Sequence, residues 1–226
     1  MKSILTNNQK EVLLTILTFS AVSSVLLLIR MLVSGTARLG FLQWNLFLAW
    51  LPLIFAFLFY RRVKARKDFT WQNSLLGFLW IAFLPNSFYI ITDLIHLQSS
   101  GEVGLLYDTA MITSFVLNGL FLGYISMYLI DKVLRKFIEQ KVVFTLMQFV
   151  LLLCAFAIYL GRYLRWNTWD IVFNPAGLLF DVSDRIINPG THVHTFVVTG
   201  VYFVLLSSTY LVLHRLYAVV RAHAKQ

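Results

Sequence analysis

Six apolar segments, each long enough to cross a lipid bilayer, constrain this chain more than any other feature. A helix rises 1.5 Å per residue, so about 20 residues cross the hydrocarbon layer of a membrane. The segments cover residues 12–33, 41–60, 69–91, 105–130, 142–160 and 195–213, and their central stretches contain no Lys, Arg, Asp or Glu. The sequence therefore predicts an all-α fold, a polytopic membrane helix bundle with six transmembrane helices.

The composition excludes an ordinary soluble protein. Hydrophobic residues make up 59% of the chain and charged residues only 13%, against about 45–50% and 25% in typical globular domains. The net charge of +9 does not indicate nucleic acid, because the basic residues lie in short runs between apolar segments. No internal repeat or soluble domain is visible, so residues 1–226 are expected to form a single integral membrane domain. The first segment is too long for a cleavable signal peptide.

The distribution of basic residues predicts the orientation in the membrane. Fourteen of the nineteen Lys and Arg residues fall on one side when the connections are counted alternately, and such basic connections are retained in the cytoplasm. Both termini are therefore expected to be cytoplasmic. Four tryptophans lie near the ends of the expected spans, as amphipathic indole rings prefer: Trp44, Trp71, Trp166 and Trp169.

Polar residues collect at the expected outer end of the third span, in residues 83–97. Pro85 cannot donate a helix hydrogen bond, so we expect a break at residues 84–86, followed by a second helical piece. In that piece Asn86, Tyr89, Asp93 and His96 follow one another at spacings of 3, 4 and 3, which places them on one helix face. Irregular backbone at membrane depth is tolerated where it lines a cavity, so this stripe predicts a polar pocket. Alternatively, Asn86 only caps a helix, and Asp93 and His96 lie among lipid headgroups.

A second polar motif, residues 160–170, follows the fifth span. Arg162 and Arg165 are three residues apart, hence nearly on one face, and paired guanidinium groups suit a phosphate or a carboxylate. Snorkelling toward lipid headgroups is the alternative for either arginine. Asp170 lies in an aromatic setting and is expected to pair with one of the two arginines.

Several local elements can also be predicted. Residues 174–189 have the signals of a short amphipathic helix in the outer interface, with Asp181 and Arg185 as a local ion pair. Residues 131–141 are expected to continue the fourth span as a short amphipathic stretch. Gly119 and Gly123 are four residues apart, a spacing that lets a neighbouring helix approach closely.

No cofactor is predicted. Asp93 and His96 are spaced as two metal ligands on one helix turn could be, with His192 or His194 as a third, but the chain lacks the HExxH motif. The GxSxG and GxxxxGK[ST] motifs are also missing, and the lone Cys154 lies in an apolar run, where it would pack as a small hydrophobe.

The two polar motifs carry a family resemblance. They contain Phe83-Leu84-Pro85-Asn86-Ser87, Tyr89, Thr92-Asp93-Leu94 and His96-Leu97, followed by Leu160-Gly161-Arg162-Tyr163, Arg165, Asn167 and Trp169-Asp170. In these residues the chain resembles the family of bacterial integral membrane proteins called domain of unknown function 1361. The resemblance implies a multi-spanning protein of a bacterial cytoplasmic membrane, and it carries no established activity with it.

Three functional hypotheses remain open. The first is an enzyme that acts on a lipid or lipid-linked envelope substrate in an outward-facing pocket, with Asp93 and His96 as catalytic residues. Its substrate-binding residues would be Asn86, Tyr89, Asp108, Arg162, Arg165 and Asp170. The second is a protein that binds or transports a solute or lipid, although Asn118 and Gln148 are the only amides deep in the fourth and fifth spans. The third is a structural or regulatory membrane partner. All three expect membrane lipids as partners and no nucleic acid.

Overall fold

The computed structural model describes residues 7–66, 70–97 and 104–223. It is all-α and 89% helical, and it divides into two compact units, residues 1–130 and residues 131–226. Within the described residues, six helices are long and apolar enough to cross a membrane, which confirms the predicted fold class. Phe69, where the third span was expected to begin, lies outside the described residues.

The first unit contains four of the six candidate spans. Its helices are α1 (Asn7–Ser34), α2 (Phe41–Arg66), α3 (Trp71–Tyr89) with the 3-10 helix η1 (Ile90–His96), and α4 (Leu105–Leu134), whose last turn belongs to the second unit. Gly35, at the end of α1, has a φ of 65°, a conformation that glycine adopts without steric cost. It allows α1 to stop and α2 to begin six residues later.

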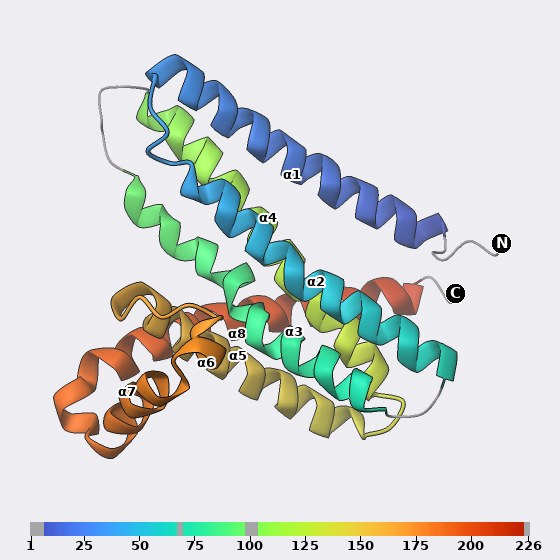
Figure 1. The fold of residues 1–226 in the computed structure, drawn as a ribbon. Helices are drawn as coiled ribbons and strands as arrows, with labels where there is room; N and C mark the ends of the chain where they lie inside the picture. The colour runs from blue at the N-terminus through green and yellow to red at the C-terminus, as the bar shows by residue number, and fades with distance from the viewer. Residues whose placement is uncertain (1–6, 67–69, 98–103, 224–226) are drawn as a thin grey trace. The chain divides into compact units, whose positions relative to one another are not determined.

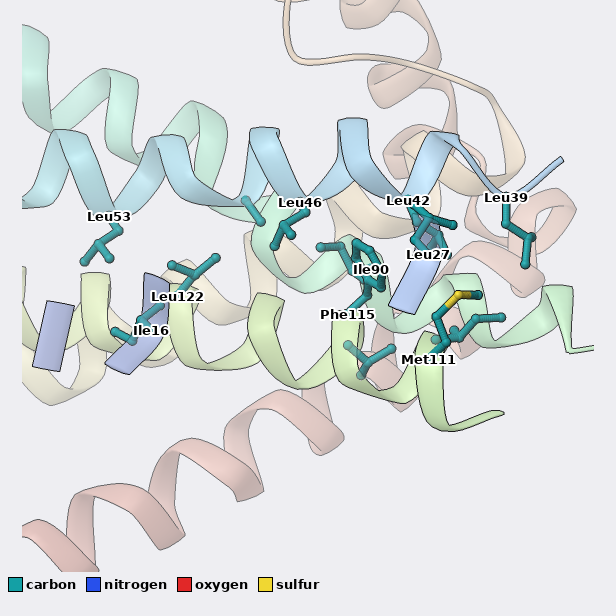
Figure 2. Packing of buried hydrophobic residues seen from close by; sticks show 13 residues of the cluster. Ile16, Leu27, Leu39, Leu42, Leu46, Leu53, Ile90, Met111, Phe115 and Leu122 are labelled. Carbon is teal, nitrogen blue, oxygen red and sulfur yellow. The ribbon is translucent and has the colours of Figure 1, made fainter. Parts of the chain in front are cut away.

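The core of the first unit lies between α1, α2 and α4, with η1 beside them (Figure 2). Leu27 of α1, Leu42 and Leu46 of α2, and Met111 and Phe115 of α4 are all buried in this cluster, together with Ile90 of η1. Many other apolar side chains of these helices are exposed, as is expected where lipid rather than protein covers a helix.

The two glycines of α4 allow α3 to approach closely, as the sequence predicted. A methyl group added at Gly119 would meet the backbone oxygen of Ser87 at 2.3 Å, and one at Gly123 would meet the ring of Phe88 at 2.7 Å. The Trp80 indole of α3 also donates to Ser126 Oγ of α4, at 3.0 Å. This packing is internal to the chain.

The second unit contains α5 (Gln140–Tyr163), α6 (Asp170–Phe173), α7 (Pro175–Ile187), η2 (Pro189–His192) and α8 (Val193–His223). The long helices α5 and α8 pack against each other, and Ser207 Oγ of α8 donates to Gln148 Oε1 of α5, at 2.5 Å. The stretch 131–141 does not continue α4 as one helix. Instead, α4 ends at Leu134, a turn follows, and α5 begins at Gln140.

The predicted amphipathic helix is present as α7. Asn174 precedes it and accepts the backbone N–H of Gly177 at 3.2 Å, while Pro175 occupies the first turn, where a missing N–H costs nothing. Its apolar Leu179, Phe180, Ile186 and Ile187 are exposed.

Candidate functional site

Polar side chains gather at one end of the first unit. The C-terminal end of α1, the N-terminal ends of α2 and α4, and η1 lie at this end (Figure 1). Arg30, Asn45, Asp93 and Asp108 come from these four elements, and all except Asn45 are at most 2% exposed. Because burying a charged group is costly unless it is paired or hydrogen-bonded, each of these residues requires an explanation.

Asp93 is the buried carboxylate of η1, with 1% of its surface exposed. Its Oδ2 accepts a hydrogen bond from Asn45 Nδ2 of α2, at 2.8 Å. The neighbouring Thr92 is also buried and turns its hydroxyl back to the carbonyl oxygen of Tyr89, at 2.7 Å. Asn45 therefore fixes the Asp93 carboxylate against α2.

His96 lies one turn of η1 beyond Asp93 and packs on the same part of α2. Its ring meets the edge of Phe41, with 4.9 Å between the centroids. Phe41 and Asn45 are four residues apart on α2, and Asp93 and His96 are three apart in η1. Side chains at i and i+3 of a 3-10 helix lie on one side, as do side chains at i and i+4 of an α-helix. Asp93 and His96 can therefore contact Asn45 and Phe41 on the same side of α2.

The break in the third span is not where the sequence predicted it. We expected it at residues 84–86, but α3 continues through Pro85 to Tyr89, and only then does the helix change to the 3-10 form. Proline removes a single helix hydrogen bond, and helices in membranes tolerate this when neighbouring helices support them. The second helical piece exists, but it begins at Ile90.

This change of helix type divides the predicted four-residue stripe. Tyr89 and Asp93 would be about 40° apart around a continuous α-helix, but a 3-10 helix turns about 120° per residue. Asp93 is thereby rotated to about 120° from Tyr89 and shares its side with His96 instead. Asn86 donates its amide to the carbonyl oxygen of Phe83, at 3.0 Å, within its own helix.

Asp108 forms a buried ion pair that the sequence did not predict. Arg30 Nε of α1 lies 3.3 Å from Asp108 Oδ1 of α4, and their side chains are 0% and 3% exposed. The guanidinium also donates to the hydroxyls of Ser34 and Thr36, at 3.4 Å and 3.2 Å. Asp108, a predicted substrate-binding residue, thus holds α1 to α4.

Arg30 and Asn45 are the two residues of this end that sequence reasoning missed. Both carried a signal. Arg30 is a cation within a candidate span, and Asn45 is an amide inside the apolar run that begins at Phe41. Intramembrane polar residues of this kind usually find a specific partner.

A second polar network lies deeper in the first unit, around Asn118. Its Oδ1 accepts the hydroxyl of Ser20 at 2.9 Å, and its Nδ2 donates to Ser23 Oγ at 2.8 Å and to the Ser114 carbonyl oxygen at 3.1 Å. The Trp50 indole of α2 donates to Ser20 Oγ, at 3.2 Å. These contacts join the middle parts of α1, α2 and α4.

In the second unit, the two arginines of the 160–170 motif do not share a helix face. Arg162 lies in the last turn of α5, but the helix ends at Tyr163. Arg165 has a φ of 62°, in the left-handed region, and is exposed. A three-residue spacing gives a common face only while the helix continues, and here it stops between the two residues.

Asp170 has a different partner from the one predicted. Its Oδ2 accepts the backbone N–H of Asn167 at 2.7 Å, so it closes the turn before α6. Among the described residues it forms no ion pair with Arg162 or Arg165. Asp side chains readily accept hydrogen bonds from backbone N–H groups a few residues away, and Asp170 does so here.

The contacts of α7 confirm the predicted pair of Asp181 and Arg185 and add others. Arg185 Nη1 lies 3.4 Å from Asp181 Oδ1, and the Trp166 indole donates to Asp181 Oδ2 at 2.7 Å. Asp184 accepts hydrogen bonds from Asn188 Nδ2 at 2.8 Å and from His192 Nε2 at 2.7 Å. These hydrogen bonds, the one from Asn188 first, hold the pKa of Asp184 below its usual value.

The two histidines considered as metal ligands have other surroundings. His192 contacts Asp184, whereas His194 packs edge-on against Tyr163, with 4.6 Å between the ring centroids. Within residues 7–66, 70–97 and 104–223, no three His, Cys, Asp or Glu side chains come together as a metal site.

The family described as Protein of unknown function (DUF1361) matches residues 44–208. This match covers more than half of the chain and contains both polar motifs. The chain belongs to this family. No curated protein and no solved structure matches it.

Asp93 and Asp108 of this DUF1361 protein are both buried at the same end of the first unit, but their contacts differ. The Asp93 carboxylate accepts a hydrogen bond from the Asn45 amide, whereas the Asp108 carboxylate pairs with the Arg30 guanidinium. A hydrogen bond of this kind fixes the orientation of a carboxylate, as a general base requires.

Proposed function

We propose that this DUF1361 protein is an enzyme of the bacterial cytoplasmic membrane that acts on a lipid or lipid-linked envelope substrate. Its pocket opens to the outer side, with both termini in the cytoplasm. Asp93 or His96 acts as the base, and Arg162 and Arg165 hold an anionic group of the substrate. Asn86 and Tyr89 complete the proposed set of binding residues, whereas Asp108 and Asp170 support the fold through the contacts described above. The observation that carries the proposal is the Asp93 carboxylate, 1% exposed and bonded to Asn45.

Burying the Asp93 carboxylate costs desolvation free energy, so packing alone does not explain an acid at this position. An apolar side chain at residue 93 would avoid the desolvation of an acid, so an acid retained inside a membrane helix supports a functional role. His96 is on the same side of η1, and an acid and an imidazole on one side can serve a single substrate group. Apolar surroundings strengthen such interactions because they exclude water.

The decisive experiment is a turnover assay with the full chain. We would reconstitute it into liposomes of total bacterial lipid extract and compare lipid composition over time by mass spectrometry. Wild type and the Gln43→Ala control, which changes an exposed amide of α2, are expected to convert a lipid, and Asp93→Asn is expected to lose that conversion. Normal conversion by a folded Asp93→Asn variant, or none by wild type, would overturn the proposal.

Binding or transport of a solute is the second candidate. The change from α3 to η1 inside a candidate span favours it, because interrupted helices often form transport sites. Proteoliposomes separate the two activities: an enzyme changes its substrate chemically, whereas a transporter accumulates it unchanged inside the vesicle.

A structural or regulatory partner is the third candidate, and the network around Asn118 favours it, since its contacts hold helices together. In that case Arg162→Ala lowers the stability of the protein in detergent and causes no separate functional defect. A loss of turnover at unchanged stability excludes this candidate.

The proposed orientation is tested with single cysteines in a Cys154→Ala background. Gly190 and Lys136 are both exposed and are predicted on opposite sides of the membrane. A membrane-impermeant maleimide added to intact cells is expected to label Gly190→Cys and to spare Lys136→Cys. The reverse pattern would invert the topology.

A further inference from the structure

Arg165 has a backbone conformation that does not suit its side chain. Its φ of 62° is the only positive φ of a non-glycine residue among the described residues. A left-handed backbone brings the Cβ atom close to the following carbonyl oxygen, so glycine, or sometimes asparagine, normally occupies such positions. An arginine there must be explained by something other than backbone preference.

The local hydrogen bonds show why the conformation is needed. Leu160, near the end of α5, accepts the N–H of Leu164 at 3.1 Å and the N–H of Trp166 at 3.2 Å. The left-handed residue between these two donors turns the chain so that both reach one carbonyl oxygen, which is a common way to end a helix. Glycine at residue 165 would make the same turn without strain.

The guanidinium of Arg165 is available to a ligand. The residue is exposed, and in the part of the chain that the structure describes its side chain makes no hydrogen bond or ion pair. The acids of the same segment are already engaged: Asp170 with the Asn167 backbone, and Asp181 with Trp166 and Arg185. Local electrostatics therefore do not explain why an arginine is kept here.

Membrane snorkelling does not explain it either. Arg165 lies two residues beyond the candidate span that ends at Tyr163, so its long side chain is at headgroup level from any ordinary backbone conformation. Snorkelling gains nothing from a left-handed φ. Strained residues that persist in folded proteins occur preferentially where a side chain must be presented in one direction.

The segment that carries Arg165 matches a lipid rather than a soluble anion. Trp169, Phe173 of α6 and Phe180 of α7 follow Arg165 in the chain and are 38%, 82% and 72% exposed. A cation in a segment with exposed aromatic side chains fits the boundary between acyl chains and headgroups. A free phosphate ion would make no use of these apolar side chains.

We infer that Arg165 binds the phosphate of an anionic phospholipid headgroup, and that its left-handed backbone is retained to present the guanidinium to that phosphate. Planar guanidinium groups bind phosphate through two parallel N–H donors. The inference deepens the proposed function because it names the chemical class of the anionic group that Arg165 holds. Any role of this lipid in turnover rests on the proposed function. Binding itself requires neither Asp93 nor catalysis.

The experiment measures both thermal stability and lipid binding of each variant, using the full chain in detergent. Arg165→Gly removes the strain and the charge, and Arg165→Lys keeps both. Arg38→Gln removes an exposed arginine from the connection between α1 and α2 and serves as the control. The probes are dioctanoyl phosphatidylglycerol, zwitterionic dioctanoyl phosphatidylcholine and inorganic phosphate, with binding followed by native mass spectrometry.

Arg165→Gly is expected to raise the melting temperature by about 2–4 °C and to weaken phosphatidylglycerol binding about tenfold, equivalent to ~1.4 kcal/mol. Arg38→Gln should bind within about threefold of wild type, since Arg165 is unchanged. Arg165→Lys should bind more weakly than wild type and more tightly than Arg165→Gly, since it keeps the charge but lacks the two parallel donors of the guanidinium. Wild type should prefer phosphatidylglycerol to both other probes.

Three results would overturn the inference: unchanged lipid binding by Arg165→Gly, a lower melting temperature in that variant, or equal binding of inorganic phosphate and phosphatidylglycerol. Asp93→Asn should bind phosphatidylglycerol as wild type does. Loss of turnover in Asp93→Asn and loss of binding in Arg165→Gly therefore test the two proposals separately.

Discussion

Arg30 and Asp108, 78 residues apart in the chain, form an ion pair of 3.3 Å that is almost completely buried. The pair joins the last turns of α1 to the first turn of α4. A single unpaired charge buried inside a membrane protein costs much free energy, whereas two opposite charges that pair with each other cost less. The pairing therefore favours one arrangement of these two helix ends over alternatives that would separate the charges.

Removing one member of this pair is expected to destabilise the first unit. Arg30→Met leaves the Asp108 carboxylate buried without its counter-charge and should cost about 3–5 kcal/mol. The double variant Arg30→Met/Asp108→Leu should recover most of that loss. The measurement is chemical unfolding in detergent, with Arg38→Met, an exposed arginine, as the control. If the single and double variants unfold alike, the charges are not coupled.

A methyl group at Gly119 is expected to disturb the packing of α4 on α3. The added Cβ would lie 2.3 Å from the Ser87 backbone oxygen, and backbone atoms cannot move aside as a flexible side chain can. Gly119→Ala should therefore cost at least about 1–3 kcal/mol.

Gly200→Ala is the matched control for this substitution, because nothing lies within 4 Å of the new atom in α8. It should stabilise its helix by about 0.5–1 kcal/mol. Thermal unfolding in detergent compares the two variants. Equal effects would mean that α3 and α4 are farther apart than described.

The Asn45 amide is expected to stabilise the fold through its hydrogen bond to Asp93. Asn45→Ala leaves a buried acceptor of Asp93 without this donor, which should cost about 1–3 kcal/mol. Gln43→Ala, which changes an exposed amide on the same helix, should be nearly neutral. Unfolding curves of the two variants that superimpose would contradict the importance of the Asn45 contact.

Acidification is expected to weaken the end of α7 through Asp184. Its hydrogen bonds from Asn188 and His192 hold its pKa below the usual Asp value of about 3.9. A carboxyl with a lowered folded pKa stabilises the fold above that usual value, and the stabilisation is lost as the pH falls through the folded pKa.

Wild type should therefore exceed Asp184→Asn in hydrogen-exchange protection of α7 at pH 6, and the difference should vanish as the pH drops below about 4. Measurements between pH 6 and pH 3 follow this convergence. A difference that persists unchanged to pH 3 would show that Asp184 acts by something other than its charge.

The helices could be predicted from the sequence because their cause is local. Apolar segments of sufficient length must form helices in a membrane, where each backbone polar group needs an internal partner. The six segments and α7 followed from this rule and from the Asn174-Pro175 start signal. The end of α3 did not, because a proline permits either a break or a continued helix, and the neighbouring helices decide between them.

The partners of the polar residues were harder to predict because they depend on tertiary contacts. The carboxylates of Asp93, Asp108 and Asp170 were recognised as unusual, but their observed contacts are with Asn45, Arg30 and the Asn167 backbone. Sequence spacing relates residues on one helix only. Which residue of another helix lies opposite depends on how the helices are rotated and shifted relative to each other.

The Asn118 network has a consequence for how the chain is assembled. Translation delivers α1 to the bilayer before α4 exists, so the hydroxyls of Ser20 and Ser23 are in place when Asn118 emerges. An amide that enters lipid without a partner loses its hydrogen bonds to water. Packing against α1 replaces them with hydrogen bonds to Ser20 and Ser23. The rotational setting of α1, which Arg30 also fixes through Asp108, is thus determined late in biogenesis, by residues synthesised 78 to 98 positions downstream of their partners.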